Sequence, residues 1–425
     1  MRAIGMFGIE KVKAREIVDS RGRPTVEVDI YTPAGFGRAA APSGASTGAT
    51  EALEIRDGGD RFHGRGVRKA VHNVNTSIAV ALRGLDVRKL RDVDRALVRL
   101  DLTDNKRIMG GNAITATSLA CARCAANSMG IPLYQYLDPY ARTLPAPMFN
   151  VINGGKHAGS GLAIQEFMIV PRVARSFAEA LRMGCEIYEE LGNLLVKKYG
   201  SSARGVGDEG GYAPLIKKTR DALDAIEEAV KRAGYSKRVA FALDCAATSF
   251  YDAKKKAYKV DGKSLSRDAL IDYYRELCRS YPIRSIEDPL DETDFGGFAV
   301  AVKKLKPAIV VGDDLLTTNL QRLERANEMG AVGAPLMKVN QIGTLTEALD
   351  VAAYAKGNGL KVIVSHRSGE TCDDSIADIA VGIGAEMIKA GAPARGERVA
   401  KYNRLLRIEE GMGEKAMYLG ASALN

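Results

Sequence analysis

Six polar residues stand at regular points in the second half of the chain, each at the end of a short apolar run. The runs are RVAFALD, PIRSIED, AIVVGDD, APLMKVN, KVIVSH and EMIKAG, and the polar residues are Asp244, Glu287, Asp313, Lys338, His366 and Lys389. Carboxylates, ammonium groups and an imidazole are the side chains that bind cations and transfer protons. The pattern therefore predicts that the six runs end at one reactive centre.

The three carboxylates indicate a bound cation. Crowding the negative charges of Asp244, Glu287 and Asp313 away from water is costly unless a cation neutralises them. Ligation by a few protein oxygens suits Mg²⁺, which keeps positions for water and substrate oxygens. A single acid after a strand is often only the cap of the next helix. The metal prediction therefore depends on the repetition in three consecutive runs.

The two lysines suggest what the cation is for. A carbon acid beside a carboxylate is very weak until the enolate charge is stabilised, so its chemistry needs a base and concentrated positive charge. The residue pattern leaves open whether Lys338 or Lys389 is that base. A nearby divalent cation and a second ammonium group would lower the pKa of a lysine toward neutrality, as a base requires.

The spacing of the runs predicts the elements that position these residues. From the second run onward, successive runs lie about 20 to 30 residues apart, which leaves room for one helix and two turns. This is the β/α repeat of a parallel barrel. Continuous apolarity suits strands that are buried on both faces. Barrel enzymes carry their chemistry at the carboxyl ends of the strands, where these polar residues stand.

The first third of the chain follows a different pattern. Residues 7–39 alternate as in TVEVDIYT, with a turn-rich stretch at 20–24, which predicts an antiparallel meander. Residues 64–136 have helical periodicity, so a small α+β domain is expected. The segment 137–147 contains three prolines and is the predicted linker. We therefore place the domains at 1–138 and 139–425.

Composition narrows the class of protein. A chain of 425 residues exceeds what one hydrophobic core usually supports, so two domains are expected. The net charge of +9 is spread along it, and the densest lysine stretches, 254–256 and 303–306, have no aromatic stacking platform, so we expect an anionic substrate and no nucleic acid. No apolar run reaches the roughly 20 residues of a membrane span, and no signal peptide is recognisable, so a cytoplasmic location is expected.

Nine short motifs resemble those of the enolase family and occur in the family's order. The likeness extends from AREIVDSRG to RLLRIEEGMG and so covers nearly the whole chain. The motifs are SGASTG (43–48), NGGKHAG (153–159), QEFM (165–168), GDEGG (207–211), SIEDP (285–289), GDDL (312–315), LMKVNQIG (336–343), SHRSGET (365–371) and KAGAP (389–393).

The resemblance implies a fold and a reaction. The expected fold is α/β, with a C-terminal TIM-like (β/α)8 barrel that has an enolase-type modified start, preceded by a smaller α+β capping domain. The expected reaction is the reversible dehydration of 2-phospho-D-glycerate to phosphoenolpyruvate and water, through an enolate. Enolase-type sites use a lysine or histidine base with one or two Mg²⁺ ions.

The resemblance also assigns the proton transfers. Lys338 would take the proton from carbon 2, and Glu209 would protonate the departing 3-hydroxyl. Glu166 and Gln165 would lie beside that hydroxyl and position it. Because a carboxylic acid donates a proton only while protonated, we expect a raised pKa for at least one of Glu209 and Glu166.

The remaining roles concern the metal and the substrate. The three strand-end carboxylates would hold one Mg²⁺, with Glu287 and Asp313 also near the substrate. A second Mg²⁺ would arrive with the substrate and be held by its phosphate and by Ser46 of the mobile loop Ser43–Gly48. The other residues implied in catalysis or substrate binding are His157, Ser365, His366, Arg367, Ser368 and Lys389, of which Arg367 and Ser368 would grip the phosphate.

Four residues depart from the family pattern: Thr50, Pro335, Cys372 and Ala390. None is a predicted ligand or catalyst, so they affect the expected loop closure and strand geometry and not the reaction. The resemblance further implies a homodimer, or a larger homo-oligomer, built partly from the small domain.

Two alternatives remain to be tested. A racemase or cycloisomerase of the same superfamily would share the carboxylates but would carry a Lys-x-Lys pair where this chain has IQEFMIV, which favours dehydration. A binding or structural protein that reuses the fold would have lost a catalytic group, whereas every group named above is present.

Overall fold

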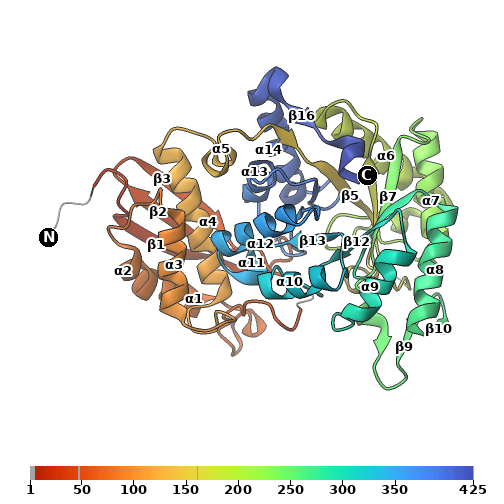
Figure 1. The fold of residues 1–425 in the computed structure, drawn as a ribbon, viewed down its shortest axis with the longest axis horizontal. Helices are drawn as coiled ribbons and strands as arrows, with labels where there is room; N and C mark the ends of the chain where they lie inside the picture. The colour runs from red at the N-terminus through yellow and green to blue at the C-terminus, as the bar shows by residue number, and fades with distance from the viewer. Residues whose placement is uncertain (1–4, 46–47, 160, 425) are drawn as a thin grey trace.

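The computed structural model describes residues 5–45, 48–159 and 161–424 of the chain. The small domain and the barrel lie side by side, with the small domain in red and orange (Figure 1). The small domain begins with an antiparallel sheet in the order β1-β2-β3, which confirms the predicted meander. Its strands are β1 (Lys11–Val18), β2 (Pro24–Thr32) and β3 (Gly35–Ala40).

One alanine-rich helix, α4, packs across this sheet. It lies so close to β3 that a Cβ atom on Gly37 would stand 2.3 Å from the carbonyl oxygen of Ala120. Small side chains on both elements therefore permit the contact. The helices of the domain are α1 (Arg68–Asn73), α2 (Ala79–Leu82), α3 (Leu90–Asp101), α4 (Gly111–Ser128) and α5 (Leu133–Leu137).

Eight strands close into a barrel in the order β11-β12-β13-β14-β15-β5-β6-β7. Strand β6 is antiparallel to β5 and β7, and the other neighbours are parallel. This ββαα start is the modified start that the resemblance implies. The strands are β5 (Ala146–Asn153), β6 (Glu166–Pro171), β7 (Val239–Asp244), β11 (Ile283–Glu287), β12 (Ile309–Gly312), β13 (Ala334–Met337), β14 (Ile363–Ser365) and β15 (Met387–Lys389).

The linker prediction is wrong in its second half. Residues 143–144 form β4, and β5 begins at Ala146, inside the predicted segment. Pro147 lies within β5 opposite Ile388. Proline is tolerated in a strand where its nitrogen is not needed as a donor, so a proline-rich stretch does not exclude a strand.

Helices cover the outside of the barrel (Figure 1). They are α6 (Phe177–Tyr199), α7 (Thr219–Arg232), α8 (Arg267–Ser280), α9 (Phe295–Lys304), α10 (Leu320–Glu328), α11 (Val339–Ile342), α12 (Leu345–Gly357), α13 (Ser375–Gly382) and α14 (Gly396–Met412). A small sheet follows β7, and a short strand near the end of the chain pairs with β4; these strands are β8 (Tyr251–Asp252), β9 (Ala257–Val260), β10 (Lys263–Leu265) and β16 (Met417–Tyr418).

The barrel interior has its own apolar core, separate from the layer between strands and helices. Ala146, Ala242 and Leu336 belong to it, and all are fully buried. Pro335 pairs with Gly312, and β13 keeps both neighbours, so this departure leaves the strand intact. Apolar side chains fill the barrel, and the polar ones stand at the carboxyl ends of its strands.

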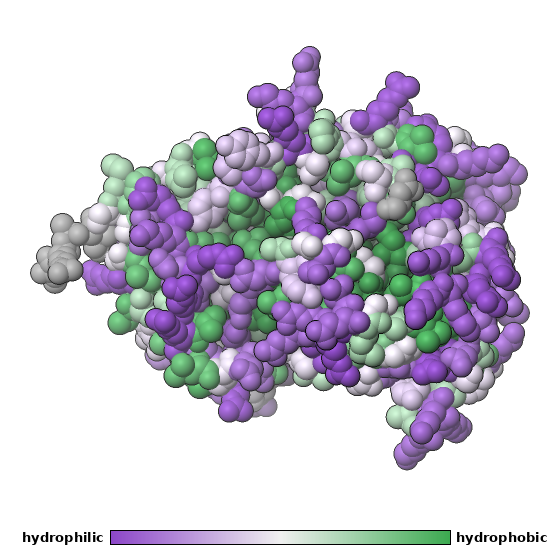
Figure 2. Space-filling view, in the orientation of Figure 1, coloured by the Kyte–Doolittle hydropathy of each residue, from purple (hydrophilic) through white to green (hydrophobic). Residues whose placement is uncertain are grey.

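Hydrophilic side chains are spread over both domains on the face shown in Figure 2, with smaller hydrophobic areas between them. Within the described ranges, no helix has the length and apolarity needed to cross a membrane.

Candidate active site

The strand ends bring the predicted residues to one buried cavity. Asp244, Glu287 and Lys389 are the last residues of their strands, and Asp313, Lys338 and His366 each follow one directly. Glu287 is not among the lining residues but pairs with Lys389, which is, and Ser46 lies outside the described residues. The cavity is lined by Gly44, Ala45, His157, Gln165, Glu166, Glu209, Asp244, Asp313, Lys338, Ser365, His366, Arg367, Ser368 and Lys389.

The ammonium group of Lys389 gathers three carboxylates. Its Nζ lies 3.0 Å from Oδ2 of Asp244, 2.9 Å from Oε2 of Glu287 and 3.2 Å from Oε1 of Glu166. These side chains are almost fully buried. The pairing keeps several negative charges together in the absence of water.

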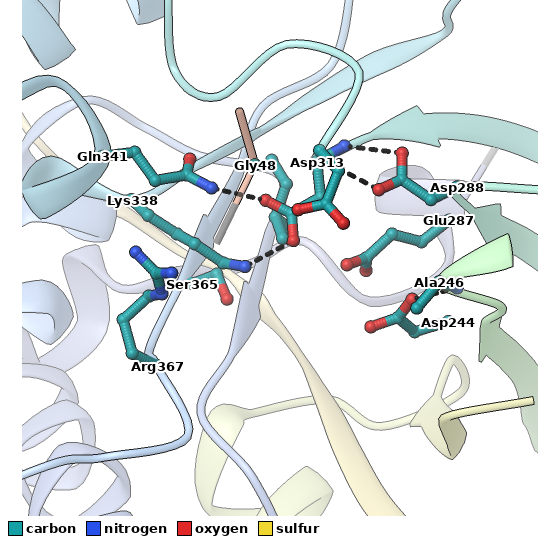
Figure 3. A network of polar contacts seen from close by, with 12 residues as sticks. Gly48, Asp244, Ala246, Glu287, Asp288, Asp313, Lys338, Gln341, Ser365 and Arg367 are labelled. Carbon is teal, nitrogen blue, oxygen red and sulfur yellow. Dashed lines mark hydrogen bonds and ion pairs between the residues drawn. The ribbon is translucent and has the colours of Figure 1, made fainter. Parts of the chain in front are cut away.

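The carboxylate of Asp313 is held by Lys338 and Gln341 (Figure 3). Its Oδ2 pairs with the Nζ of Lys338, and its Oδ1 accepts a hydrogen bond from Nε2 of Gln341 at 2.8 Å. Gln341 stands three residues after Lys338, on the single turn of α11. The residue before this short helix and the helix itself therefore supply the two partners of one carboxylate.

The pKa directions of the two lysines are opposite to the expected one. Burial lowers the pKa of Lys338, but the neighbouring carboxylates, Asp313 first, together raise it more, so the net pKa lies above its ordinary value. Burial also lowers the pKa of Lys389, but the carboxylates around it, Asp244 first, together outweigh burial and raise the pKa well above its ordinary value. The physical reason is that the nearest groups are carboxylates. A divalent cation on the same carboxylates would offset their charge.

The donor chemistry fits a hard divalent cation. Asp244, Glu287 and Asp313 offer buried carboxylate oxygens from three adjacent strands. Among the described residues, the sets whose ligand atoms all lie within 4.8 Å of one another are different ones, namely His157, Glu166 and Glu209, and Asp288, Asp313 and Asp314. The three predicted metal ligands are instead paired with the ammonium groups of Lys338 and Lys389.

The set that contains Asp288 has a structural explanation. Oδ1 of Asp288 accepts the backbone N–H of Asp313 at 3.0 Å, and Oδ2 accepts that of Asp314 at 2.7 Å (Figure 3). Both oxygens therefore fix the loop after β12, and Asp288 positions Asp313. Asp313 therefore belongs both to this set and to the three strand-end carboxylates, which stay the predicted metal ligands.

Two buried carboxyl groups, Glu166 and Glu209, lie around His157. Its Nδ1 stands 3.7 Å from an oxygen of each. Burial and the neighbouring Glu209 raise the pKa of Glu166 well above its ordinary value. Burial raises the pKa of Glu209 as well, but His366 and His157 lower it further, so its net shift is downward. The expectation of one raised pKa is met by Glu166.

The residue predicted to bind the substrate phosphate, Arg367, is paired with a carboxylate that the sequence analysis did not identify, Glu51. Both terminal nitrogens of Arg367 donate to Glu51, at 2.9 and 3.2 Å. Oε1 of Glu51 also accepts the backbone N–H of Gly48 at 3.0 Å and Nε2 of Gln341 at 3.2 Å. Glu51 therefore connects the end of the SGASTG loop to the guanidinium group and to the residue that holds Asp313.

A second missed residue, Arg21, comes from the turn between β1 and β2. Its guanidinium donates to Oγ of Ser368 at 3.3 Å and to the carbonyl oxygens of Ser43 and Gly44 at 3.0 and 3.4 Å. The small domain thus contributes side chains to a site built on barrel strands. The available signal was that Arg21 and Glu51 lie in or next to motifs shared with the family.

Fold and site together define a class of protein: a β/α-barrel enzyme whose strand-end carboxylates and lysines act on an anionic substrate. Two family models match the chain: "Enolase, N-terminal domain" over residues 9–137 and "Enolase, C-terminal TIM barrel domain" over residues 141–425. The chain belongs to the enolase family and is a lyase.

Curated relatives support this assignment along nearly the whole chain. The chain is 57% identical over 418 residues to the enolase of Methanosarcina barkeri, covering 98% of this chain and 97% of the relative. It is 57% identical over 413 residues to the enolase of Methanothrix thermoacetophila, and the match covers 97% of this chain and 98% of the relative. It is 55% identical over 415 residues to the enolase of Methanopyrus kandleri, and the match covers 96% of this chain and 97% of the relative.

Proposed function

We propose that the protein catalyses the reversible dehydration of 2-phospho-D-glycerate to phosphoenolpyruvate and water, the step of glycolysis and gluconeogenesis that its family name implies. One observation carries the proposal. One buried cavity joins an amine, a buried pair of carboxyl groups and a guanidinium group to Asp244 and Asp313, and its Lys389 binds the third strand-end carboxylate, Glu287. These groups match the base, the acid, the phosphate grip and the metal ligands that this reaction requires.

The proton transfers are divided between two sides of the cavity. Lys338, at the end of β13, accepts the proton from carbon 2 of the substrate. Glu209 donates a proton to the departing 3-hydroxyl, with Glu166 and Gln165 beside it. In the structure without substrate the raised pKa belongs to Glu166 and the lowered one to Glu209. The proposal therefore requires Glu209 to take up a proton before it acts as the acid.

Charge stabilisation is the other half of the task. Lys389 pairs with the substrate carboxylate, and Arg367 and Ser368 bind the phosphate. Asp244, Glu287 and Asp313 would hold the first of two Mg²⁺ ions, and Ser46 would contribute to the second. The bound ions would supply positive charge beside the substrate carboxylate, where the enolate charge develops.

The oligomeric state and the location belong to the same proposal. We expect a homodimer in the cytoplasm, with domains dividing at 138 and 139. A cavity of 580 Å³ lies between the small domain and the barrel, and Val18, at the end of the edge strand β1, is 59% exposed beside it. The side chain of Asn75 pairs with the outer edge of β1 at Ala14, and a second copy of the chain would cover the exposed end of the strand at Val18.

A direct assay tests the proposed reaction. Purified protein with 2-phosphoglycerate and Mg²⁺ should produce phosphoenolpyruvate, followed by its ultraviolet absorbance, and chelation of the metal should stop the reaction. Absence of product with and without Mg²⁺ would contradict the assignment. A racemase is disfavoured because β6 carries Glu166 and no lysine pair.

A further inference from the structure

Arg398 is a fully buried arginine that no step of the proposed reaction uses. It lies on α14, directly behind the cavity, and has no exposed surface. One terminal nitrogen, Nη1, lies 2.6 Å from Nδ1 of His366 and donates to the carbonyl oxygen of Arg367 at 2.6 Å. The other, Nη2, donates to the carbonyl oxygens of Asp208 and Ser368, at 2.8 and 2.6 Å.

The chemistry of guanidinium decides the state of the imidazole. Arginine has only N–H donors, so Nδ1 of His366 must be the acceptor of this hydrogen bond. The ring is then neutral, and its proton is on Nε2. That nitrogen lies 3.2 Å from Oε2 of Glu209, close enough for an ion pair, although the angles do not make it a hydrogen bond. A doubly protonated ring would direct an N–H at the guanidinium N–H groups, which is repulsive.

The turn before α14 is shaped for this contact. Gly391 has φ +86°, and a Cβ atom there would stand 2.7 Å from Cδ of Arg398 and 2.7 Å from the carbonyl oxygen of Glu209. Only glycine allows both to approach. The turn thus lets the arginine reach the loops that carry Glu209, His366 and Arg367.

We propose that Arg398 is a positioning residue that fixes His366 as a neutral imidazole with its proton on Nε2, the nitrogen that lies beside Glu209. His366 then presents an N–H group to the acid side of the cavity and does not act as a proton carrier. Burial lowers the pKa of His366 to about 3, which agrees with this role. The charged groups that face the ring are Glu209, Arg398 and Lys389. The kinetic consequences rest on the proposed function, whereas the state of the ring does not.

The ring can be observed directly by NMR of protein with ¹⁵N-labelled histidine. The chain has four histidines, and a His366→Gln variant identifies the signal of His366. We expect the parent ring to be neutral, protonated at Nε2, and without titration between about pH 5 and 8, where a free histidine titrates. A proton on Nδ1, or titration in this range, would overturn the proposal without any variant of Arg398.

Arg398→Met removes the donor, and Lys401→Met is the matched control. Lys401 lies on the same helix, is 1% exposed, and binds Glu370 and two carbonyl oxygens without contacting His366. We expect Arg398→Met to populate the other tautomer or an imidazolium state, and Lys401→Met to retain the parent pattern even if its Tm falls. An unchanged ring in Arg398→Met, or the same change in both variants, would refute the assignment.

Kinetics distinguish positioning from a loss of stability. A wrong tautomer can reduce kcat by orders of magnitude in enzymes that depend on one imidazole, so we expect Arg398→Met to lower kcat at least about tenfold and to add an ionisation to its pH profile. In the His366→Gln background the same change should cost less than about threefold, because the two residues act as a unit. Equal losses in both backgrounds would indicate a purely structural arginine. Failure of the parent to form phosphoenolpyruvate would refute the proposed function and leave the NMR result standing.

Discussion

At the scale of single residues, the cavity is organised by pairs of opposite charge that substrate and metal would have to rearrange. Lys389 holds Asp244 and Glu287, Lys338 holds Asp313, and Glu51 holds Arg367. Each pair contains at least one group that, in the proposed reaction, binds the substrate or the metal. Binding therefore exchanges internal partners for external ones, and variants should separate the base from the metal ligands.

The base can be tested by proton exchange at carbon 2. Lys338→Ala should lower the exchange rate at least about 10³-fold, because a positioned base commonly contributes 10² to 10⁴. Mg²⁺ binding, measured by calorimetry, should remain, since the carboxylates are unchanged. Exchange at the parent rate would show that another group, Lys389 first, is the base.

The metal ligands can be tested by the Mg²⁺ concentration that gives half-maximal activity. Glu287→Gln should raise it at least about tenfold, since loss of even an indirect partner of a metal ligand commonly costs 10- to 100-fold in affinity. Asp291→Asn is the charge-matched control, four residues further along the chain and outside the cavity lining. Equal responses of both variants would argue for a general charge effect and against ligation by Glu287.

At the scale of elements, the contact between α3 and the start of α12 joins the small domain to the barrel close to the base. Oδ2 of Asp94, on α3, accepts the backbone N–H of Thr346 in the first turn of α12 at 2.9 Å. The same helix begins with a capping box formed by Thr344 and Glu347. Helix α12 follows directly after Lys338 and α11, so this contact supports the position of the base.

Asp94 also predicts a pH dependence of stability. Burial raises its pKa from 3.8 to about 6, so the folded state binds this proton more tightly than the unfolded state. Its contribution to stability is present below about pH 4 and is lost as the pH rises through about 6, a loss on the order of 3 kcal/mol. Asp94→Asn should therefore raise Tm at pH 8 by about 3 °C, from the usual entropy of unfolding per residue, and leave it nearly unchanged at pH 4.

Scanning calorimetry at the two pH values measures this difference. A variant that loses stability equally at both pH values would show that the carboxylate contributes mainly through its hydrogen bond to Thr346.

At the scale of the whole molecule, the small domain completes a site that the barrel begins. Arg21 and Glu51 reach Ser368 and Arg367 across the contact between the domains. The larger cavity beside Val18 lies on the same domain contact and contains none of the predicted site residues. The two cavities therefore suggest two uses of one junction: chemistry in the buried cavity and self-association at the open one.

The proposed homodimer can be tested with one substitution. Val18→Glu places a charge on the exposed end of β1, where an apolar contact with a second copy is expected, and should shift the protein toward monomer in sedimentation velocity experiments. Val80→Glu is the control, because Val80 is 78% exposed on α2 and does not line the cavity. A parent protein that sediments as a monomer, or a Val18→Glu variant that remains dimeric, would contradict this interface.

Sequence by itself determined the order of elements and most of the chemical groups. Period-2 and helical patterns located the small domain, and six apolar runs located barrel strands β7 and β11–β15, because strands buried on both faces must be continuously apolar. The polar residues that end those runs do meet at the carboxyl end of the barrel. The pattern did not reveal β5 and β6 as barrel strands, since prolines and a loop motif lie between the domain helices and Glu166.

Tertiary structure alone decided how those groups are paired. The antiparallel direction of β6, the contacts of Arg21, Glu51 and Arg398, and the unequal pKa values of Glu166 and Glu209 all depend on residues far apart in the chain. Electrostatic interactions depend on distance and burial, which sequence spacing does not specify. Composition and order therefore indicate which groups are available, and the folded arrangement sets their partners and protonation.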